Sequence, residues 1–254
     1  MTIRVGVLGA AGRMGLTVCE AVEADPELEL VARIDPAGGD GISTSIDGFG
    51  DAEVVVDFTQ PASVLENIRA CVAKGVHCVV GTTGLTEANI QEIARLVEGG
   101  RSNAFIAPNF SLGAVLLMHL AKQAARYLGS VEIVELHHNQ KLDAPSGTAM
   151  KTARDIAEVW KEHGRPTGGL AHPDEEETVT GARGAVVEGI NVHAVRLHGL
   201  LAHEEVLFGA QGQTLSIRHD SIDRSSFMPG VILAVKTVAW RPGLTVGLEH
   251  LMDL

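Results

Sequence analysis

The chain has little cysteine and little positive charge, and each shortage excludes a class of protein. Its 20 lysines and arginines stand against 32 aspartates and glutamates, giving a net charge of −12. This charge argues against nucleic acid and anionic membrane surfaces as partners. The three cysteines, Cys19, Cys71 and Cys78, lie in apolar periodic segments without disulfide or metal-ligand spacing. We therefore expect reduced core thiols in a cytoplasmic protein.

Long apolar runs are also missing from the sequence. The longest apolar stretch, near residues 114–120, is too short and too interrupted to span a bilayer. The chain opens directly into a strand-like run at residues 3–8, so we expect no secretory signal peptide. Glycine is abundant by contrast, with 29 among 254 residues, which indicates many tight turns and close backbone approaches.

The first hundred residues alternate short β-branched runs with helical periodicity. The runs predict strands at 3–8, 28–34, 54–57, 77–80 and 104–106. The periodic segments predict helices at 14–24, 61–74 and 87–97, the last capped by Thr86. Strands and helices that alternate over short connections are typical of an α/β fold, a doubly wound parallel sheet with helices on both faces.

The pattern changes after residue 110. We predict helices at 112–128, 148–161 and 226–239, and strands at 131–136, 190–197, 205–208, 214–219 and 244–247. A polar stretch at 163–184 is expected to form a surface loop. Several strands with two helices predict a second, α+β domain with a mixed or antiparallel sheet. The predicted division is residues 1–110 and 225–254 for a dinucleotide-binding domain, and 111–224 for a substrate-binding and oligomerisation domain.

A glycine-rich turn follows the first predicted strand and opens the first helix. Its glycines, Gly9, Gly12 and Gly15, would let the backbone approach a pyrophosphate at the helix N-terminus. Asp35 lies 20 residues beyond Gly15, where a carboxylate would accept hydrogen bonds from the adenosine ribose. The alternative, a glycine turn with an unrelated surface aspartate, fits this register less well. The cofactor-binding residues predicted here are Gly9, Ala10, Ala11, Gly12, Arg13, Met14 and Asp35.

Two later loops follow the fourth and fifth predicted strands, at the sheet edge where such folds bind ligands. Taken without the glycine turn, each would be interpreted as ordinary strand-to-helix turn chemistry. They add Gly81, Thr82, Thr83, Ala107, Pro108, Asn109 and Phe110 to the predicted cofactor site. The choice of nucleotide stays open: Asp35 followed by Pro36 favours NADH, whereas Arg13 and Arg33 are nearby cations that could accept the 2′-phosphate of NADPH.

The segment 135–151, ELHHNQKLDAPSGTAMK, concentrates the groups that a proton-dependent reduction of a small anion needs. His137, His138 and Lys141 are candidate proton donors and cations. Ser146, Gly147 and Thr148 are typical of a helix N-terminus, whose free N–H groups could bind a carboxylate. A packed histidine pair and a simple helix cap are the structural alternatives. Adjacent histidines lack metal-ligand spacing, so no metal site is expected.

These motifs together resemble the dihydrodipicolinate reductase family, whose members are 4-hydroxy-tetrahydrodipicolinate reductases. The resemblance covers nearly the full length, through VGVLGAAGRMG, VVDFT, GTTG, APNFS and the specific ELHHxxKxDAPSGTA segment. It implies a Rossmann-like domain, a cytoplasmic homotetramer, and NADH- or NADPH-dependent reduction of 4-hydroxy-2,3,4,5-tetrahydrodipicolinate in diaminopimelate and lysine biosynthesis.

The resemblance also implies roles for single residues. His137 would donate or accept the proton, Lys141 would be a second proton donor, and His138 would contact the substrate. Gly147 and Thr148 would hold a carboxylate of the small dicarboxylate substrate. Two rival functions remain: another NAD(P)-dependent imine or amino-acid reductase, and a dinucleotide sensor that has lost catalysis. The sensor would be expected to lose His137 or Lys141, and both are present.

Overall fold

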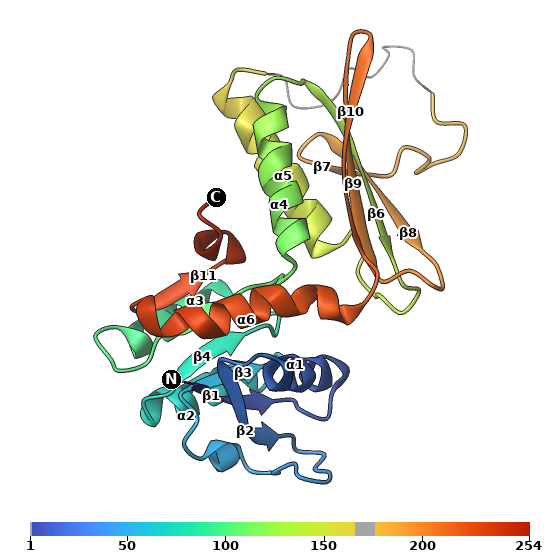
Figure 1. Cartoon of the computed structure of the whole chain (residues 1–254). Helices are drawn as coiled ribbons and strands as arrows, with labels where there is room; N and C mark the ends of the chain where they lie inside the picture. Colours follow the sequence, from blue (N-terminus) through green and yellow to red (C-terminus); the bar gives the residue numbers. More distant parts are fainter. Residues whose placement is uncertain (1, 166–175) are drawn as a thin grey trace. The chain divides into compact units, whose positions relative to one another are not determined.

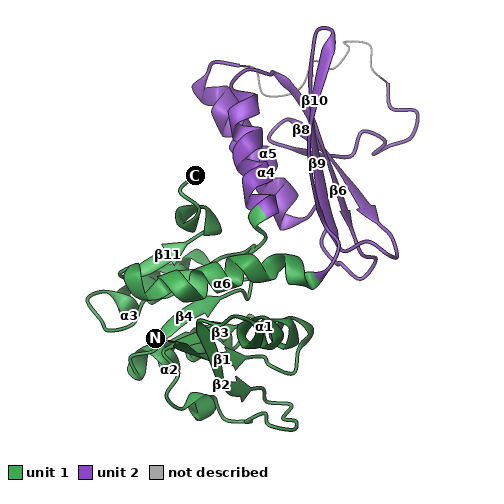
Figure 2. Ribbon diagram, in the orientation of Figure 1, with its two compact units in different colours: residues 1–112, 224–254 green, residues 113–223 purple. Residues whose placement is uncertain are grey.

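A computed structural model describes residues 2–165 and 176–254. The chain divides into two compact units, Met1–Leu112 with Arg224–Leu254, and Gly113–Asp223 (Figure 2). Ten residues of the predicted polar stretch, 166–175, lie outside the described residues. Among the described residues, no helix is long and apolar enough to cross a membrane.

Unit 1 contains a six-stranded sheet in which every neighbouring pair is parallel (Figure 1). Its order is β11-β5-β4-β3-β1-β2. The strands are β1 (Ile3–Leu8), β2 (Leu28–Ile34), β3 (Val54–Asp57), β4 (His77–Val80), β5 (Ala104–Ile106) and β11 (Leu244–Val246). The last strand comes from the far end of the chain, so the C-terminal segment completes the N-terminal unit.

Helices cover both faces of this sheet. They are α1 (Arg13–Ala24), α2 (Val64–Ala73), α3 (Glu87–Val97) and α6 (Met228–Thr237), with short 3₁₀ segments at Ile46–Phe49, Arg224–Phe227, Val238–Trp240 and Leu248–Leu251. α1 contacts α6, and α2 contacts α3. Strand alternation explains the two layers: Val55 belongs to the core cluster with Ile68 of α2 and Ile93 of α3, whereas Val54 and Val56 are buried but lie outside that cluster. The predicted doubly wound parallel sheet is confirmed.

Unit 2 contains a five-stranded mixed sheet in the order β10-β9-β6-β8-β7. Its elements are β6 (Ser130–His137), β7 (Ala185–Val187), β8 (Ile190–Arg196), β9 (Ala202–Ala210), β10 (Gln213–Ser221), α4 (Leu112–Ala125) and α5 (Gly147–Glu162). β6 and β8 are parallel, and the other pairs are antiparallel. α5 packs against β6, β7 and β8, with Trp160 buried and its indole N–H donating to the Leu128 carbonyl at 2.9 Å.

Several predicted helices extend beyond the observed ones. The helix predicted from residue 61 begins at Val64, because residues 61–63 form a turn in which the Ser63 N–H donates to the Gln60 carbonyl. The helix predicted to residue 128 ends at Ala125 and continues as a turn. The helix predicted at 226–239 is α6 with 3₁₀ turns on either side. β7 was not predicted: it directly follows the polar stretch 163–184, and its first two residues, Ala185 and Val186, are exposed.

Candidate active site

The glycine turn of unit 1 needs its glycines for close backbone packing. Gly9 has φ +80°, and a Cβ there would lie 2.6 Å from the Phe58 carbonyl oxygen. A Cβ on Gly15 would lie 2.0 Å from the Gly9 carbonyl oxygen. In the part of the chain that the structure describes, the N–H groups of Arg13 and Met14 have no acceptor, so the first turn of α1 is available to an anion.

Asp35 links this turn to the loop that follows β2. One carboxylate oxygen accepts from the Ala11 N–H at 3.1 Å, and the other accepts from the Ala37 N–H at 2.9 Å. Each oxygen can accept further hydrogen bonds. A cavity of about 470 Å³ opens here. It is lined by Leu8, Gly9, Gly12, Ile34, Asp35, Pro36, Thr44, Ile46, Phe58, Thr59, Gln60, Ser63 and Asn67. The sequence prediction contained Gly9, Gly12 and Asp35 of this set and missed the β3–α2 loop.

Asp57 organises that missed loop from inside. Its side chain is buried and accepts from the Thr59 N–H at 2.8 Å, the Thr59 hydroxyl at 2.6 Å and the Asn67 amide at 2.8 Å. Burial raises the pKa of Asp57, and these donors oppose the rise. The Thr82 hydroxyl also donates to Asp57, at 3.2 Å. Thr82, predicted to bind cofactor, therefore already uses its hydroxyl within the fold.

The other predicted cofactor residues differ in accessibility. Ala10, Ala107 and Phe110 are buried, so their side chains belong to the core, and the Phe110 ring lies 5.8 Å from that of Phe58. Ala11, Arg13, Thr83 and Pro108 are exposed, while Met14, Gly81 and Asn109 are half-buried. Arg33, considered as a phosphate ligand, forms an ion pair with Glu23 instead.

In unit 2, His137 ends β6 and shares its strand face with Glu135. The His137 Nδ1 lies 2.5 Å from a carboxylate oxygen of Glu135, which is fully buried. Burial would raise the pKa of Glu135, but hydrogen bonds from His137 and Arg196, and their charges, hold it below its ordinary value. An ionised Glu135 can only accept, so His137 donates through Nδ1. Its Nε2 has no hydrogen-bond partner among the described residues.

Arg196 and Asp143 were not predicted, and they join Lys141 to this group. Arg196 donates to both oxygens of Glu135, each at 2.8 Å, and to the Asp143 carbonyl at 2.6 Å. The Lys141 ammonium lies 2.8 Å from the Asp143 carboxylate and holds the pKa of that carboxyl below its usual range. The sequence carries no local signal for Arg196, because it joins this group only through the β6–β8 register, which pairs it with His137.

The N-terminus of α5 belongs to the same cluster. Ser146 is the N-cap: its hydroxyl accepts from the Ala149 N–H at 3.2 Å, and its own N–H donates to Glu135 at 3.0 Å. The N–H groups of Gly147 and Thr148 have no acceptor within the described chain. A Cβ on Gly147 would meet nothing within 4 Å, so open space lies beside these donors. A carboxylate fits such a position.

His138 lies one residue beyond β6. Its N–H donates to the Leu201 carbonyl at 3.4 Å, and its carbonyl accepts from the Lys141 N–H at 3.2 Å. Its backbone therefore fixes the start of the loop that carries Lys141.

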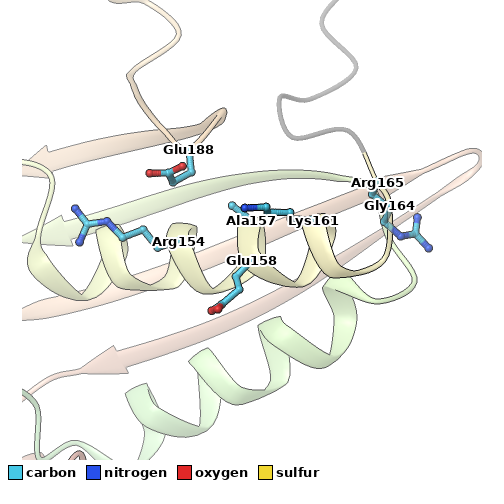
Figure 3. A pocket seen from close by; sticks show the side chains of 7 residues that line it. All are labelled: Arg154, Ala157, Glu158, Lys161, Gly164, Arg165 and Glu188. Atoms are coloured by element: carbon cyan, nitrogen blue, oxygen red, sulfur yellow. The ribbon is translucent and has the colours of Figure 1, made fainter.

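A second cavity, of about 950 Å³, runs along α5 (Figure 3). Arg154, Lys161 and Arg165 share it with Glu158 and Glu188, and no residue predicted from the sequence lines it. The described residues contain no cluster of three or more histidine, cysteine, aspartate or glutamate side chains that could hold a metal ion.

The parallel sheet with its glycine turn, and the histidine–lysine cluster beside a free helix N-terminus, define a class: two-unit reductases that use a pyridine nucleotide. Two family profiles match the chain, dihydrodipicolinate reductase N-terminus over residues 3–110 and C-terminus over residues 113–252.

Curated relatives named 4-hydroxy-tetrahydrodipicolinate reductase agree with these profiles. The protein from Mycolicibacterium vanbaalenii is 52% identical over 99% of this chain and its own full length. That from Nocardia farcinica is 54% identical over the full length of both chains. Among solved structures, a dipicolinate-bound dihydrodipicolinate reductase from Paenisporosarcina sp. TG-14 is 41% identical, with a TM-score of 0.87 over 98% of this chain and 99% of its own.

The chain belongs to the dihydrodipicolinate reductase family. Its activity is the NAD(P)H-dependent reduction of 4-hydroxy-2,3,4,5-tetrahydrodipicolinate to 2,3,4,5-tetrahydrodipicolinate, with loss of water, in diaminopimelate and lysine biosynthesis. The family, the fold class and the enzyme class predicted from the sequence are confirmed.

Proposed function

We propose that unit 2 performs the proton chemistry of this reduction, with His137 and Lys141 as the catalytic groups. The observation that carries the proposal is one connected set of contacts. The buried Glu135 carboxylate binds His137 Nδ1, Arg196 and the Ser146 N–H, and Arg196 continues to Asp143, which pairs with Lys141. A possible proton donor, a cation and an anion-binding helix terminus are thus joined by hydrogen bonds.

The reaction places different demands on these groups. The nucleotide, when bound, supplies a hydride to C4 of a conjugated imine. Negative charge then develops at the far end of the conjugated system, where a cation or an acid stabilises it. His137 Nε2, which has no partner in the described chain, and the Lys141 ammonium, which is paired with Asp143, are the groups proposed to do so. His138 is proposed as a further substrate contact.

The substrate carries two carboxylates, and unit 2 offers two kinds of anion ligand. The amides of Gly147 and Thr148 would hold one carboxylate with the help of the α5 dipole, worth up to about 1 kcal/mol. Lys141 would attract the other. The Paenisporosarcina relative binds dipicolinate, a dicarboxylate of the same size.

For the nucleotide, we propose the glycine turn Gly9–Met14 as the pyrophosphate site and Asp35 as the ligand of the adenosine ribose. Backbone groups of the predicted Gly81–Thr83 and Ala107–Phe110 loops would line the rest. The negative charge of Asp35 disfavours a 2′-phosphate. Of the two arginines near the turn, Arg33 forms an ion pair with Glu23. Arg13 has no ion pair in the described chain and is therefore the cation that could accept the phosphate. NADH is therefore the proposed better substrate, with NADPH also used.

We also propose a cytoplasmic homotetramer. The support comes from the sheet of unit 2. On the face opposite to the Glu135 side chain, Val186, Val195 and Leu207 are exposed. Exposed apolar side chains on a sheet face that also carries ion-paired groups, such as Glu132 with His193, are compatible with a subunit interface. The mass in solution from light scattering tests this assembly.

The test of the catalytic proposal is the Lys141→Ala variant. We expect turnover to fall roughly 10²–10⁴-fold, the usual contribution of a general acid. The assay follows nucleotide oxidation while the preceding synthase makes the substrate from pyruvate and aspartate semialdehyde. Lys151→Ala, which removes a lysine of α5 that pairs with Asp155, is the matched control. Near-normal turnover in Lys141→Ala would remove Lys141 from the mechanism.

A further inference from the structure

Glu135 has no part in the proton transfer proposed above, yet four hydrogen bonds converge on its carboxylate. Its side chain is fully buried. One oxygen accepts from His137 Nδ1 at 2.5 Å and Arg196 Nη1 at 2.8 Å. The other accepts from Arg196 Nη2 at 2.8 Å and the Ser146 N–H at 3.0 Å. Four donors on two oxygens leave this carboxylate one orientation.

The three residues that supply these donors lie on three different elements. Glu135 and His137 are two residues apart on β6 and share a face. Arg196 is paired with His137 on the neighbouring strand β8, and Ser146 is the N-cap of α5. The carboxylate is therefore fixed by two elements other than the strand that carries the histidine. Because the Glu135 carboxylate is held in place, its hydrogen bond to Nδ1 fixes the orientation of the His137 ring.

Other histidine–carboxylate pairs of this sheet also have arginine donors, but their carboxylates are exposed to solvent. His193 lies 2.7 Å from Glu132, and His203 lies 2.6 Å from Asp220. The acidic side chains of those pairs are 32% and 38% exposed, against 0% for Glu135. Solvent can replace the acid in the exposed pairs, but it cannot reach Glu135.

The two ring nitrogens of a histidine have different roles, and the hydrogen bond at one sets the chemistry of the other. We propose that Glu135 is a positioning residue for the reaction: by holding the proton on His137 Nδ1, it makes Nε2 the nitrogen that gives its proton to the substrate. The proton leaves Nε2, the ring changes from cation to neutral, and the Nδ1–H bond to Glu135 persists. Solvent then returns a proton to Nε2. This inference rests on the proposed role of His137.

The charged groups around Glu135 fit that role. Arg196 on β8 supplies one positive charge, and the N-terminus of α5 supplies a partial one. Asp143 contacts Arg196 through its carbonyl and is itself paired with Lys141. On β9, Glu204 lies opposite Glu135. It is buried, burial raises its pKa to about 7, and the Thr152 hydroxyl opposes the rise. Below pH 7 this carboxyl is mostly protonated, so it then adds little negative charge beside Glu135.

The first test compares Glu135→Gln with Glu204→Gln, which alters a buried carboxyl on the same sheet face that does not touch His137. In Glu135→Gln we expect kcat to fall about 10²-fold, the range for loss of an outer partner of a reacting group, with the KM for the dicarboxylate little changed. Glu204→Gln should keep the kcat of the natural enzyme. A natural kcat in folded Glu135→Gln would overturn the inference.

The second test reads the histidine directly, by ¹⁵N NMR of the His137 ring in the whole enzyme without ligands. The neutral ring should carry its proton on Nδ1, and Glu135→Gln should mix the two tautomers. A neutral ring protonated on Nε2 in the natural enzyme would overturn the inference without any variant. Should Glu135→Gln fail to fold, Glu135→Asp replaces it: the charge for Arg196 stays, but the carboxylate is one methylene shorter, and the tautomers should again mix.

The two proposals fail in different ways. If His137→Gln keeps its turnover, the catalytic role of His137 is wrong whatever the tautomer. If His137→Gln loses turnover while Glu135→Gln keeps both its kcat and the Nδ1–H tautomer, His137 is catalytic and Glu135 does not position it.

Discussion

Three carboxylates beside the candidate sites show how the surroundings of a single residue set its chemistry. Asp35 accepts from two backbone amides, lines a cavity, and can accept further hydrogen bonds. Asp57 is buried among hydroxyl and amide donors that carry no charge, and its pKa is raised by burial. Glu135 is buried beside cations, and its pKa is lowered despite burial. Asp57 is therefore a structural acceptor, whereas the cations around Glu135 favour its ionised form.

At Asp35, the prediction concerns the choice of nucleotide. Asp35→Ala should lower the kcat/KM for NADH more than that for NADPH. The carboxylate would accept hydrogen bonds from the ribose hydroxyls of NADH, and it would repel the 2′-phosphate of NADPH. The loss for NADH should be about tenfold or more in kcat/KM, the value of one or two hydrogen bonds to a charged group.

Both nucleotides are titrated side by side in this experiment, since the variant also removes the anchors of the Ala11 and Ala37 amides. An equal loss for both nucleotides would mean that Asp35 only shapes the loop. Asp40→Ala, an exposed acid in the same loop region, controls for the change in net charge.

The site residues differ in how far the sequence could predict them. Local spacing alone is enough to propose Asp35, His137 and Lys141 as site residues. Arg196 was not, because its contact with Glu135 exists only once β6 and β8 pair in one register. Thr82 shows the complementary limit: its place in the loop can be predicted from the sequence, but the direction of its hydroxyl depends on Asp57.

At the scale of elements, two helices begin in a similar way. α1 follows the glycine turn and α5 follows the Ser146 cap, and each leaves first-turn amides without an acceptor in the described chain. Neither has an acidic residue in its first turn. An acid there would satisfy the helix dipole from within, so both N-termini are left for an external anion.

Two glycine substitutions in these first turns test whether Gly15 is needed for its close contact with the Gly9 carbonyl oxygen. Gly15→Ala should lower the free energy of unfolding by about 1–3 kcal/mol although alanine favours helices, because its Cβ would meet the Gly9 carbonyl oxygen. Gly147→Ala should leave stability unchanged or slightly raised, because its Cβ meets open space. Thermal unfolding of both variants is the measurement. A Gly15→Ala variant as stable as Gly147→Ala would show that the glycine turn is not held by this contact.

Element types were easier to predict than element ends. β-branched runs bounded by glycine, proline or polar residues gave β1 to β5 at their observed limits. Helix ends were overestimated at residues 61–63 and 126–128, where turn hydrogen bonds replace helical ones. Such ends depend on which backbone groups find partners in the folded chain, and periodicity carries no information on that.

Across the whole molecule, two buried glutamates make the stability depend on pH in opposing ways. Glu135 has a lowered pKa, so its stabilising contribution is present above its unfolded pKa and is lost as the pH falls through the folded value. Glu204 has a pKa raised from 4.5 to about 7. The folded state therefore binds its proton more tightly, and stability falls as the pH rises between those two values. The two buried glutamates are register partners on the adjacent strands β6 and β9.

The Glu204→Gln variant separates these effects. The amide stays neutral, so the variant should match the natural protein near pH 5 and exceed it near pH 8 by on the order of 3 kcal/mol, the value of the pKa shift. For a chain of this size, that corresponds to several degrees in Tm, at about 2–4 °C per kcal/mol. Glu20→Gln, which removes an exposed glutamate of α1, should change neither value. Equal Tm for Glu204→Gln and the natural protein near pH 8 would show that Glu204 is already ionised at little cost, and that the pair with Glu135 tolerates two buried negative charges.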